Sequence, residues 1–145
     1  MRVVIQRVKK TTLSVDGQLI SSIPHGLAVY FGVKAGDTEA QVDYAVKKIA
    51  GMRIFEDEAG KMNLSVSDVG GEVLLISQFT LLADCSRGNR PSFIEAERPE
   101  RANQLYEYGV KALSTYGITV KKGVFGADMK IEQYNDGPVT IVLDC

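Results

Sequence analysis

Residues 27–33 read LAVYFGV, an apolar run that carries no charged side chain. A short continuous apolar run of this kind, rich in β-branched and aromatic residues, predicts a strand that is covered on both faces. Residues 73–82 (VLLISQFTLL) form a second such run and predict another central strand. The two runs therefore predict the middle of a β-sheet, around which the rest of the chain must be arranged.

Two other stretches have the spacing of amphipathic helices. Thr38 and Gln41 form the pattern of a capping box, and the apolar residues that follow recur at helical spacing. This predicts a first helix over residues 39–50. A second helix is predicted from Pro99, a residue favoured at the first helical position, to Gly117.

The remaining segments predict further strands. Asp16-Gly17 lies between apolar alternations, which is a strong hairpin signal. Further strands are predicted at residues 2–8, 118–122, 130–135 and 139–144. Because strands and helices do not alternate as regular βαβ units, the order predicts an α+β fold. We expect a single compact domain over residues 1–145, with mostly antiparallel or mixed, barrel-like β-sheets and two main helices.

Composition sets few limits on function. The chain has 145 residues, 45% of them hydrophobic and 24% charged, and its formal net charge of -1 gives no argument for nucleic-acid binding. Cys85 and Cys145 do not have the spacing of a disulfide framework or a zinc site. No apolar stretch approaches the roughly 20 residues that span a bilayer, and the first residues lack a signal-peptide pattern. We expect a cytoplasmic protein without a membrane partner.

Conventional catalytic motifs are absent from the sequence. His25, the single histidine, lies in a turn and is predicted to be a solvated surface residue. One histidine cannot supply a multi-histidine metal centre, and no GxSxG, HExxH or Walker pattern occurs. The acidic residues 56–58 are predicted to form a hairpin tip rather than a cation site. We expect no metal and no cofactor, so an enzyme with this sequence must rely on backbone groups, hydroxyls and positioning.

Polar residues interrupt the second apolar run at Ser77, Gln78 and Thr80. A polar group in a buried strand costs about 1–3 kcal/mol unless it is hydrogen-bonded. These side chains either bond to neighbouring strands or mark a strand end that lines a pocket. In the second case Thr80 offers a hydroxyl, and the amides near Phe79 and Thr80 are candidates to stabilise an oxyanion.

A second unusual segment is NDGPVT at residues 135–140. Its composition favours a tight turn between two strands. Pro138 does not suit a simple hairpin, because proline cannot donate a hydrogen bond to a strand ladder. A cis bond between Gly137 and Pro138 would reorient the adjacent carbonyls, which could then capture an ammonium group.

These two segments, SQFTL at residues 77–81 and NDGPVT at 135–140, resemble the signature motifs of the D-aminoacyl-tRNA deacylase family. MRVVIQRV at the start of the chain and RGNRPSF at residues 87–93 also resemble that family, and the resemblance covers essentially the whole chain. It implies an enzyme that hydrolyses the ester between a D-amino acid and the 3′-terminal adenosine of tRNA. It also implies removal of glycine from wrongly charged tRNA.

The resemblance further implies a homodimer with its active sites at the interface. A cis Gly137–Pro138 bond would enter the pocket of the partner and exclude L-amino acids there. The residues expected to act on the ester are Ser77, Gln78, Phe79 and Thr80. The residues expected to bind substrate are Gly137, Pro138, Val139, Thr140, Phe125, Met129 and Arg7.

Several of these assignments leave alternatives open. Arg7 either anchors the Gly-Pro segment or is a surface arginine at a strand edge. Phe125 and Met129 either wall the adenosine or amino-acid pocket or pack in the core. Thr80 is either a nucleophile or a positioning group, and the lack of a base favours positioning. Candidates for phosphate contacts are Arg87, Arg90, Lys121 and Lys122.

Two other functions compete with the deacylase. A non-catalytic nucleic-acid-binding module would explain the arginine-rich segment 83–98, although the near-neutral charge and the lack of a dense basic patch disfavour it. A hydrolase of another small ester or amide would also need a pocket at residues 77–81.

Overall fold

A long first strand organises the sheet of the protein, which a computed structural model describes over residues 1–145. The first half of β1 (Arg2–Val15) pairs with β3 (Gly26–Gly32), and its second half pairs with β2 (Gln18–Ile23). β8 (Met129–Asp144) pairs with β1 along nearly its whole length, and all three pairings are antiparallel. The predicted hairpin at Asp16-Gly17 is confirmed, since Val15 pairs with Gln18.

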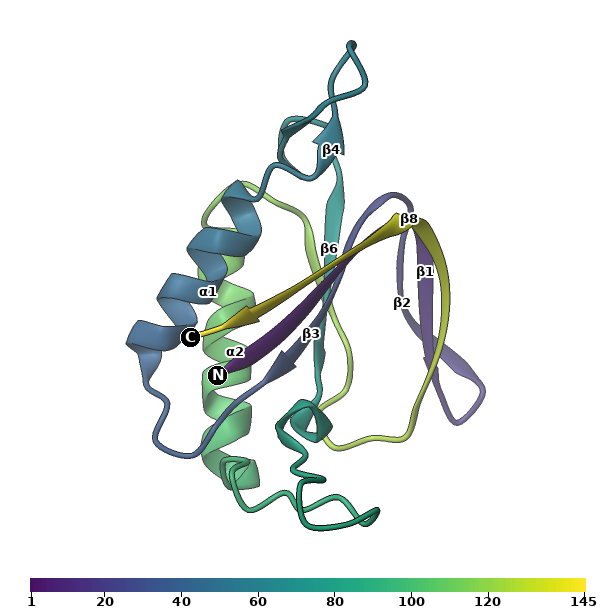
Figure 1. The fold of residues 1–145 in the computed structure, drawn as a ribbon. Helices are drawn as coiled ribbons and strands as arrows, with labels where there is room; N and C mark the ends of the chain where they lie inside the picture. The colour runs from purple at the N-terminus through teal and green to yellow at the C-terminus, as the bar shows by residue number, and fades with distance from the viewer.

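The sheet becomes parallel beyond β3. β6 (Glu72–Ser77) lies parallel to β3, and β7 (Val120–Lys122) lies parallel to β6. The resulting order is β2-β1-β3-β6-β7, with β8 on β1, and the sheet curves into a nearly closed barrel (Figure 1). β4 (Phe55–Glu56) and β5 (Met62–Leu64) form a separate small hairpin, which confirms the hairpin predicted around the acidic residues.

Two helices cover one face of the sheet, side by side (Figure 1). α1 (Glu39–Gly51) begins at the predicted capping box, and α2 (Pro99–Ser114) begins at the predicted proline. Gly109 lets α2 approach its neighbours closely, because a Cβ there would lie 3.3 Å from Val42 Cγ1 and 3.4 Å from Phe31 Cζ. The predicted α+β fold with a barrel-like mixed sheet and two main helices is confirmed. Neither helix is long and apolar enough to cross a membrane.

The core lies on both faces of β3 and β6, as the two apolar runs predict. Leu27, Val29 and Phe31 point into a large cluster that also contains the inner faces of both helices. The alternate residues, among them Ala28 and Ile76, point into a smaller cluster inside the barrel. Burial of both faces excludes water from the centre of the sheet and explains why these segments carry no alternating polar residues.

The boundaries of several predicted strands are wrong. The strand predicted over residues 2–8 continues to Val15. The strand predicted over residues 73–82 ends at Ser77, and residues 79–82 form a 3-10 helix, η1 (Phe79–Leu82). The partner strand β3 ends at this level, since the last pair is Phe31 with Ser77, so the chain beyond has no strand to pair with. The strands predicted at 130–135 and 139–144 are one strand, β8, because β1 is long enough to pair with both and the intervening residues are accommodated by register shifts.

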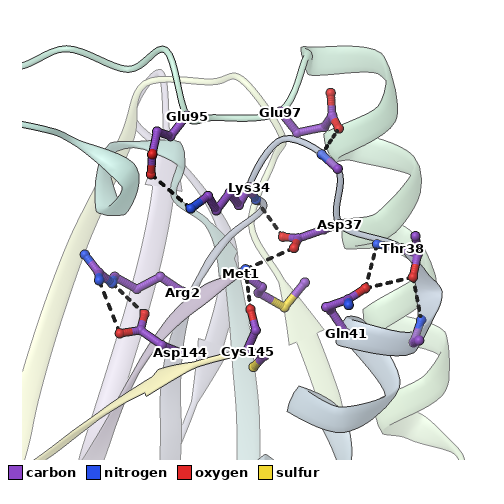
Figure 2. A network of polar contacts seen from close by, with 12 residues as sticks. Met1, Arg2, Lys34, Asp37, Thr38, Gln41, Glu95, Glu97, Asp144 and Cys145 are labelled. Atoms are coloured by element: carbon purple, nitrogen blue, oxygen red, sulfur yellow. Dashed lines mark hydrogen bonds and ion pairs between the residues drawn. The ribbon is translucent and has the colours of Figure 1, made fainter.

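The two chain ends are fixed to each other and to the loop before α1 (Figure 2). The Met1 ammonium donates to Asp37 Oδ1 at 3.0 Å and to the Cys145 carbonyl at 2.8 Å. The same loop is tied to the segment before α2, because Lys34 Nζ lies 3.1 Å from a Glu95 carboxylate oxygen. These contacts hold the start of β1, the end of β8 and the segment leading to α2 in one place.

Candidate active site

The chain passes from the buried strand β6 to an accessible pocket wall at the end of that strand. Ser77 and Gln78 are half-buried, whereas Phe79 and Thr80 at the start of η1 are exposed. The Gln78 amide still bonds to the Phe31 carbonyl of β3 at 2.9 Å, one residue beyond the last paired residue of β6. The first amides of a helix have no partner within that helix. In η1 these are the amides of Phe79 and Thr80.

A cavity of about 660 Å³ opens beside this strand end. Of the residues predicted to form the site, Ser77, Gln78 and Phe79 line it from one side. Phe125 lines it from the segment between β7 and β8, and Met129 lines it from the start of β8. Ten of the sixteen lining residues are hydrophobic, so the cavity is an apolar pocket with polar groups at one wall.

The segment before α2 supplies a wall that the sequence reasoning did not assign to the site. Phe93, Glu97 and Arg98 line the cavity, as does Ala102 in the first turns of α2. The Phe93 ring packs edge-on against Phe79, with 5.0 Å between the ring centroids. The signal for Phe93 in the sequence is its place in the stretch RGNRPSF, which resembles the family; no signal in the sequence singles out Ala102.

Residues 135–140 lie within β8 and form no tight turn, so that interpretation is wrong. Asn135 pairs with Val8 and Thr140 pairs with Gln6, so four β8 residues face a single β1 residue, Arg7. The chain bulges there because β1 has no residues to pair with them. The Gly137–Pro138 bond is cis, both residues are exposed, and neither lines the cavity of its own chain.

Arg7 is a buried arginine beneath this bulge, 7% exposed. Its Nε donates to the Asp136 carbonyl at 3.0 Å, and its Nη1 donates to the Ile54 carbonyl at 2.7 Å. The Asp136 carboxylate also lies 3.3 Å from Nε. Arg7 therefore contacts the residue immediately before Gly137, and it lies outside the cavity.

Thr140 belongs to a chain of polar side chains on β1, β3 and β8. Gln6 Nε2 donates to Thr140 Oγ1 at 3.2 Å, and Gln133 Nε2 donates to Gln6 Oε1 at 2.7 Å. Tyr30 Oη donates to Gln133 Oε1 at 3.0 Å, and burial raises the pKa of this phenol. The neutral Tyr30 hydroxyl thus remains a donor at neutral pH.

The electrostatics of the cavity do not supply a conventional base. Glu97 is the only lining carboxylate, and hydrogen bonds from the Arg98 and Gly36 amides hold its pKa below the usual range. His25 contacts the Val69 carbonyl at 3.0 Å and does not line the cavity. Thr80 Oγ1 accepts a hydrogen bond from Gln78 Nε2. The wall can therefore orient a substrate and donate hydrogen bonds, but it has no paired nucleophile and base.

The basic candidates for phosphate contacts differ in their surroundings. Lys121 Nζ donates to the Ser22 carbonyl at 2.9 Å, and Lys122 Nζ lies 2.6 Å from a Glu107 carboxylate oxygen. Arg87 and Arg90 are exposed in the segment before α2. The two lysines are thus engaged with the protein itself.

Known proteins resemble the chain along nearly its whole length. The family model for D-Tyr-tRNA(Tyr) deacylase matches residues 4–144. A D-aminoacyl-tRNA deacylase of Lactobacillus delbrueckii subsp. bulgaricus is 58% identical over 99% of both chains. One of Aquifex aeolicus is 52% identical over 99% of this chain and 97% of its own.

Solved structures agree on the fold. The c-Myc DNA Unwinding Element Binding Protein superposes with a TM-score of 0.94 and is 41% identical, over 100% of this chain and 99% of that one. A structure described as "a probable eukaryotic D-amino acid tRNA deacylase" superposes with a TM-score of 0.85 over 99% of this chain and 98% of that one. Because the two sequences are 17% identical, this likeness supports the fold alone. The resemblance read from residues 77–81 and 135–140 is therefore confirmed: the chain belongs to the D-Tyr-tRNA(Tyr) deacylase family, a family of hydrolases.

Proposed function

We propose that the chain hydrolyses the ester joining a D-amino acid to the 3′-terminal adenosine of tRNA, acting in the cytoplasm. The observation that supports this most is the open end of β6, where Ser77, Gln78 and the start of η1 border an apolar cavity without a catalytic base. An aminoacyl ester is already activated. Positioned hydrogen-bond donors and an ordered water are therefore sufficient to hydrolyse it, whereas an amide would also require a catalytic acid or base.

In the proposed reaction, water attacks the carbonyl carbon of the ester. The negative charge that develops on the carbonyl oxygen is stabilised by the amides of Phe79 and Thr80, which have no partner within η1. The bond to the ribose 3′ oxygen then breaks, and this oxygen leaves as a hydroxyl with a proton taken from the water. We infer that the neighbouring ribose 2′ hydroxyl relays this proton, because it lies next to the leaving oxygen and the pocket has no histidine to act as a base. A substrate charged at the 3′ position of a 2′-deoxy terminal ribose should therefore turn over far more slowly, and undiminished turnover would exclude the relay.

The same proposal includes selection by chirality. Gly137 and Pro138 are exposed and lie outside the cavity of their own chain, which is compatible with delivery into the cavity of a second copy. In a homodimer built this way, rigid main-chain atoms would occupy the place that an L side chain needs. Glycine has no side chain to clash, so glycine mischarged on tRNA should also be released. Selection by the main chain further predicts tolerance of many D side chains.

A deacylation assay with D-aminoacyl-, L-aminoacyl- and glycyl-tRNA tests the proposal. We expect release of D-amino acids and glycine, with L-aminoacyl-tRNA left intact. Equal release of D and L forms would contradict the chiral role while leaving a deacylase. Binding of tRNA without turnover would instead support a nucleic-acid-binding module. Turnover only of unrelated esters would support a different hydrolase.

A further inference from the structure

The segment between η1 and α2 carries three arginines, of which Arg98 lines the cavity. Asp84 and Ser92 exchange backbone hydrogen bonds of 2.8 and 2.9 Å, which closes a loop that contains Arg87 and Arg90. The segment continues past Phe93 to Arg98, and both of these line the cavity. Figure 1 shows this loop at the same end of the molecule as η1 and the start of α2. The hairpin of β4 and β5 lies at the opposite end.

The acidic side chains of this segment are already occupied. Glu95 lies 3.1 Å from Lys34 Nζ (Figure 2). Glu97 accepts hydrogen bonds from the amides of Gly36 at 3.1 Å and Arg98 at 2.7 Å. Asp84 accepts one from the Ser86 amide at 2.9 Å. Each of the three carboxylates is therefore used to shape the loop or to tie it to the body of the protein.

The arginines have no such partners. The guanidinium groups of Arg87, Arg90 and Arg98 make no hydrogen bond or ion pair within the chain, and all three residues are exposed. The contrast with Lys121 and Lys122 is clear, since both of those ammonium groups contact carboxylates. A guanidinium presents several donors in a planar fork that matches phosphate oxygens. The local surplus of unused donors therefore suits a phosphodiester backbone although the whole chain is nearly neutral.

We propose that Arg98 at the cavity wall and Arg87 and Arg90 in the adjoining loop bind the phosphates of the single-stranded 3′ end of tRNA as its terminal adenosine enters the cavity. This inference rests on the proposed deacylase function and adds the surface that holds the polynucleotide. It assigns the phosphate contacts to these arginines in place of Lys121 and Lys122. The aromatic pair of Phe79 and Phe93 lines the cavity, and Phe93 directly follows the loop closed by Asp84 and Ser92.

The test compares two substrates, D-aminoacyl-tRNA and a D-aminoacyl ester of adenosine, which carries no phosphate. In Arg87→Gln/Arg90→Gln, the ratio of kcat/KM for the tRNA to that for the adenosine ester should fall about tenfold, because two charge-assisted contacts are lost. The plot of log kcat/KM for tRNA against log salt should also become shallower by about 1.4, or about 0.7 for each phosphate contact on a single strand. Arg98→Gln should lower the same ratio. Arg87→Lys/Arg90→Lys should keep the salt slope, because the charge remains, and should lower the ratio less than the glutamine variant does, because only the fork of donors is lost.

Lys47→Gln/Lys61→Gln is the matched control. It removes two exposed positive charges that also lack partners, one on α1 and one in the β4–β5 hairpin, and its ratio and salt slope should match the wild type. An unchanged ratio and slope in the arginine variant would overturn the inference, as would an equal loss in the lysine control. If the wild-type protein hydrolyses neither ester, the proposed function itself fails. Turnover of both esters without an arginine effect overturns the phosphate contacts alone.

Discussion

At the scale of single residues, the role of Thr80 distinguishes two mechanisms: nucleophilic attack by its hydroxyl and direct attack by water. Its hydroxyl accepts a hydrogen bond from Gln78, no histidine borders the cavity, and the single lining carboxylate of Glu97 is held by amides. A threonine without a base is a poor nucleophile. We therefore expect Thr80→Ala to retain at least about a tenth of wild-type kcat, as expected when one positioning contact of about 1.4 kcal/mol or less is lost.

Quenched-flow measurement of the first turnover provides the check. Wild-type protein should show no burst of released tRNA and no acyl-protein, because water attacks the ester directly. Thr80→Ser keeps the hydroxyl and should match the wild type. A covalent adduct on Thr80 would establish a nucleophile instead. Complete loss of activity in Thr80→Ala with Thr80→Ser intact would contradict the modest positioning role, because the hydroxyl would then be essential.

Arg7 illustrates a site residue that acts through the main chain. Removal of its guanidinium in Arg7→Met leaves the carbonyls of Ile54 and Asp136 without their donor, at distances of 2.7 and 3.0 Å in the native protein. An unsatisfied buried polar group costs about 1–3 kcal/mol, so the free energy of unfolding should fall by about 2 kcal/mol or more. Urea denaturation measures this loss, and deacylation should decrease as well because residues 136–138 lose their support.

Lys9→Met is the natural comparison for Arg7→Met. Lys9 is exposed and lies 3.7 Å from the same Asp136 carboxylate, so its removal should change the free energy of unfolding by less than about 1 kcal/mol. Arg7→Lys should recover little of the lost free energy of unfolding, because one ammonium group cannot replace the planar set of guanidinium donors. Similar stabilities for Arg7→Met and Lys9→Met would mean that Arg7 does not support the bulge.

At the scale of elements, the close approach of η1 to the sheet depends on Gly32. A Cβ at this position would lie 3.0 Å from the Gln78 carbonyl oxygen, 3.1 Å from the Arg2 carbonyl oxygen and 3.2 Å from Leu81 Cβ. Gly32→Ala should therefore displace η1 by a few tenths of an ångström from β3. A misplacement of about 1 Å can cost about a hundredfold in rate, so we expect kcat/KM to fall about tenfold.

Gly51→Ala gives the matched control, since a Cβ at the end of α1 meets nothing within 4 Å. Its kcat/KM should equal that of the wild type. Melting curves should show that Gly32→Ala remains folded, so that the loss is assigned to the site. Full activity in Gly32→Ala would mean that η1 does not hold the catalytic amides.

The elements also show which features local sequence can predict. Three predictions that rest on short-range signals are confirmed: the capping box at Thr38, the proline at the start of α2 and the Asp16-Gly17 hairpin. The predicted end of β6 is wrong, because a strand ends where its partner ends. The end of its partner β3 is a property of the folded sheet and not of the local sequence. The continuity of β8 depends in the same way on the length of β1.

At the scale of the whole molecule, the two segments singled out in the sequence lie apart within one chain. Ser77, Gln78 and Phe79 reach the cavity through the end of one strand, together with Phe125 and Met129. Gly137, Pro138 and Thr140 are exposed on β8, and Val139 is half-buried against the main core. None of the four lines that cavity. The number of residues between the two segments does not predict that residues 137–140 lie away from the cavity of their own chain. The loop wall formed by Phe93 and Arg98 also arises only when the segment before α2 folds back beside η1.

This separation leads to a prediction about two chains acting together. If the site of one chain is completed by Gly137–Pro138 of another, Gln78→Ala and Pro138→Ala damage different halves of it. Each variant alone should keep only about a tenth of wild-type activity, because both of its sites carry the same defect. In a refolded equimolar mixture half of the dimers are mixed, and one of the two sites in each mixed dimer contains both intact halves. Since the interface of a symmetric dimer uses both surfaces of each chain, the mixture should recover about a quarter of wild-type activity. Mixing without refolding should recover less if the dimers exchange slowly, and activity that stays at the mean of the two variants would place the whole site within one chain.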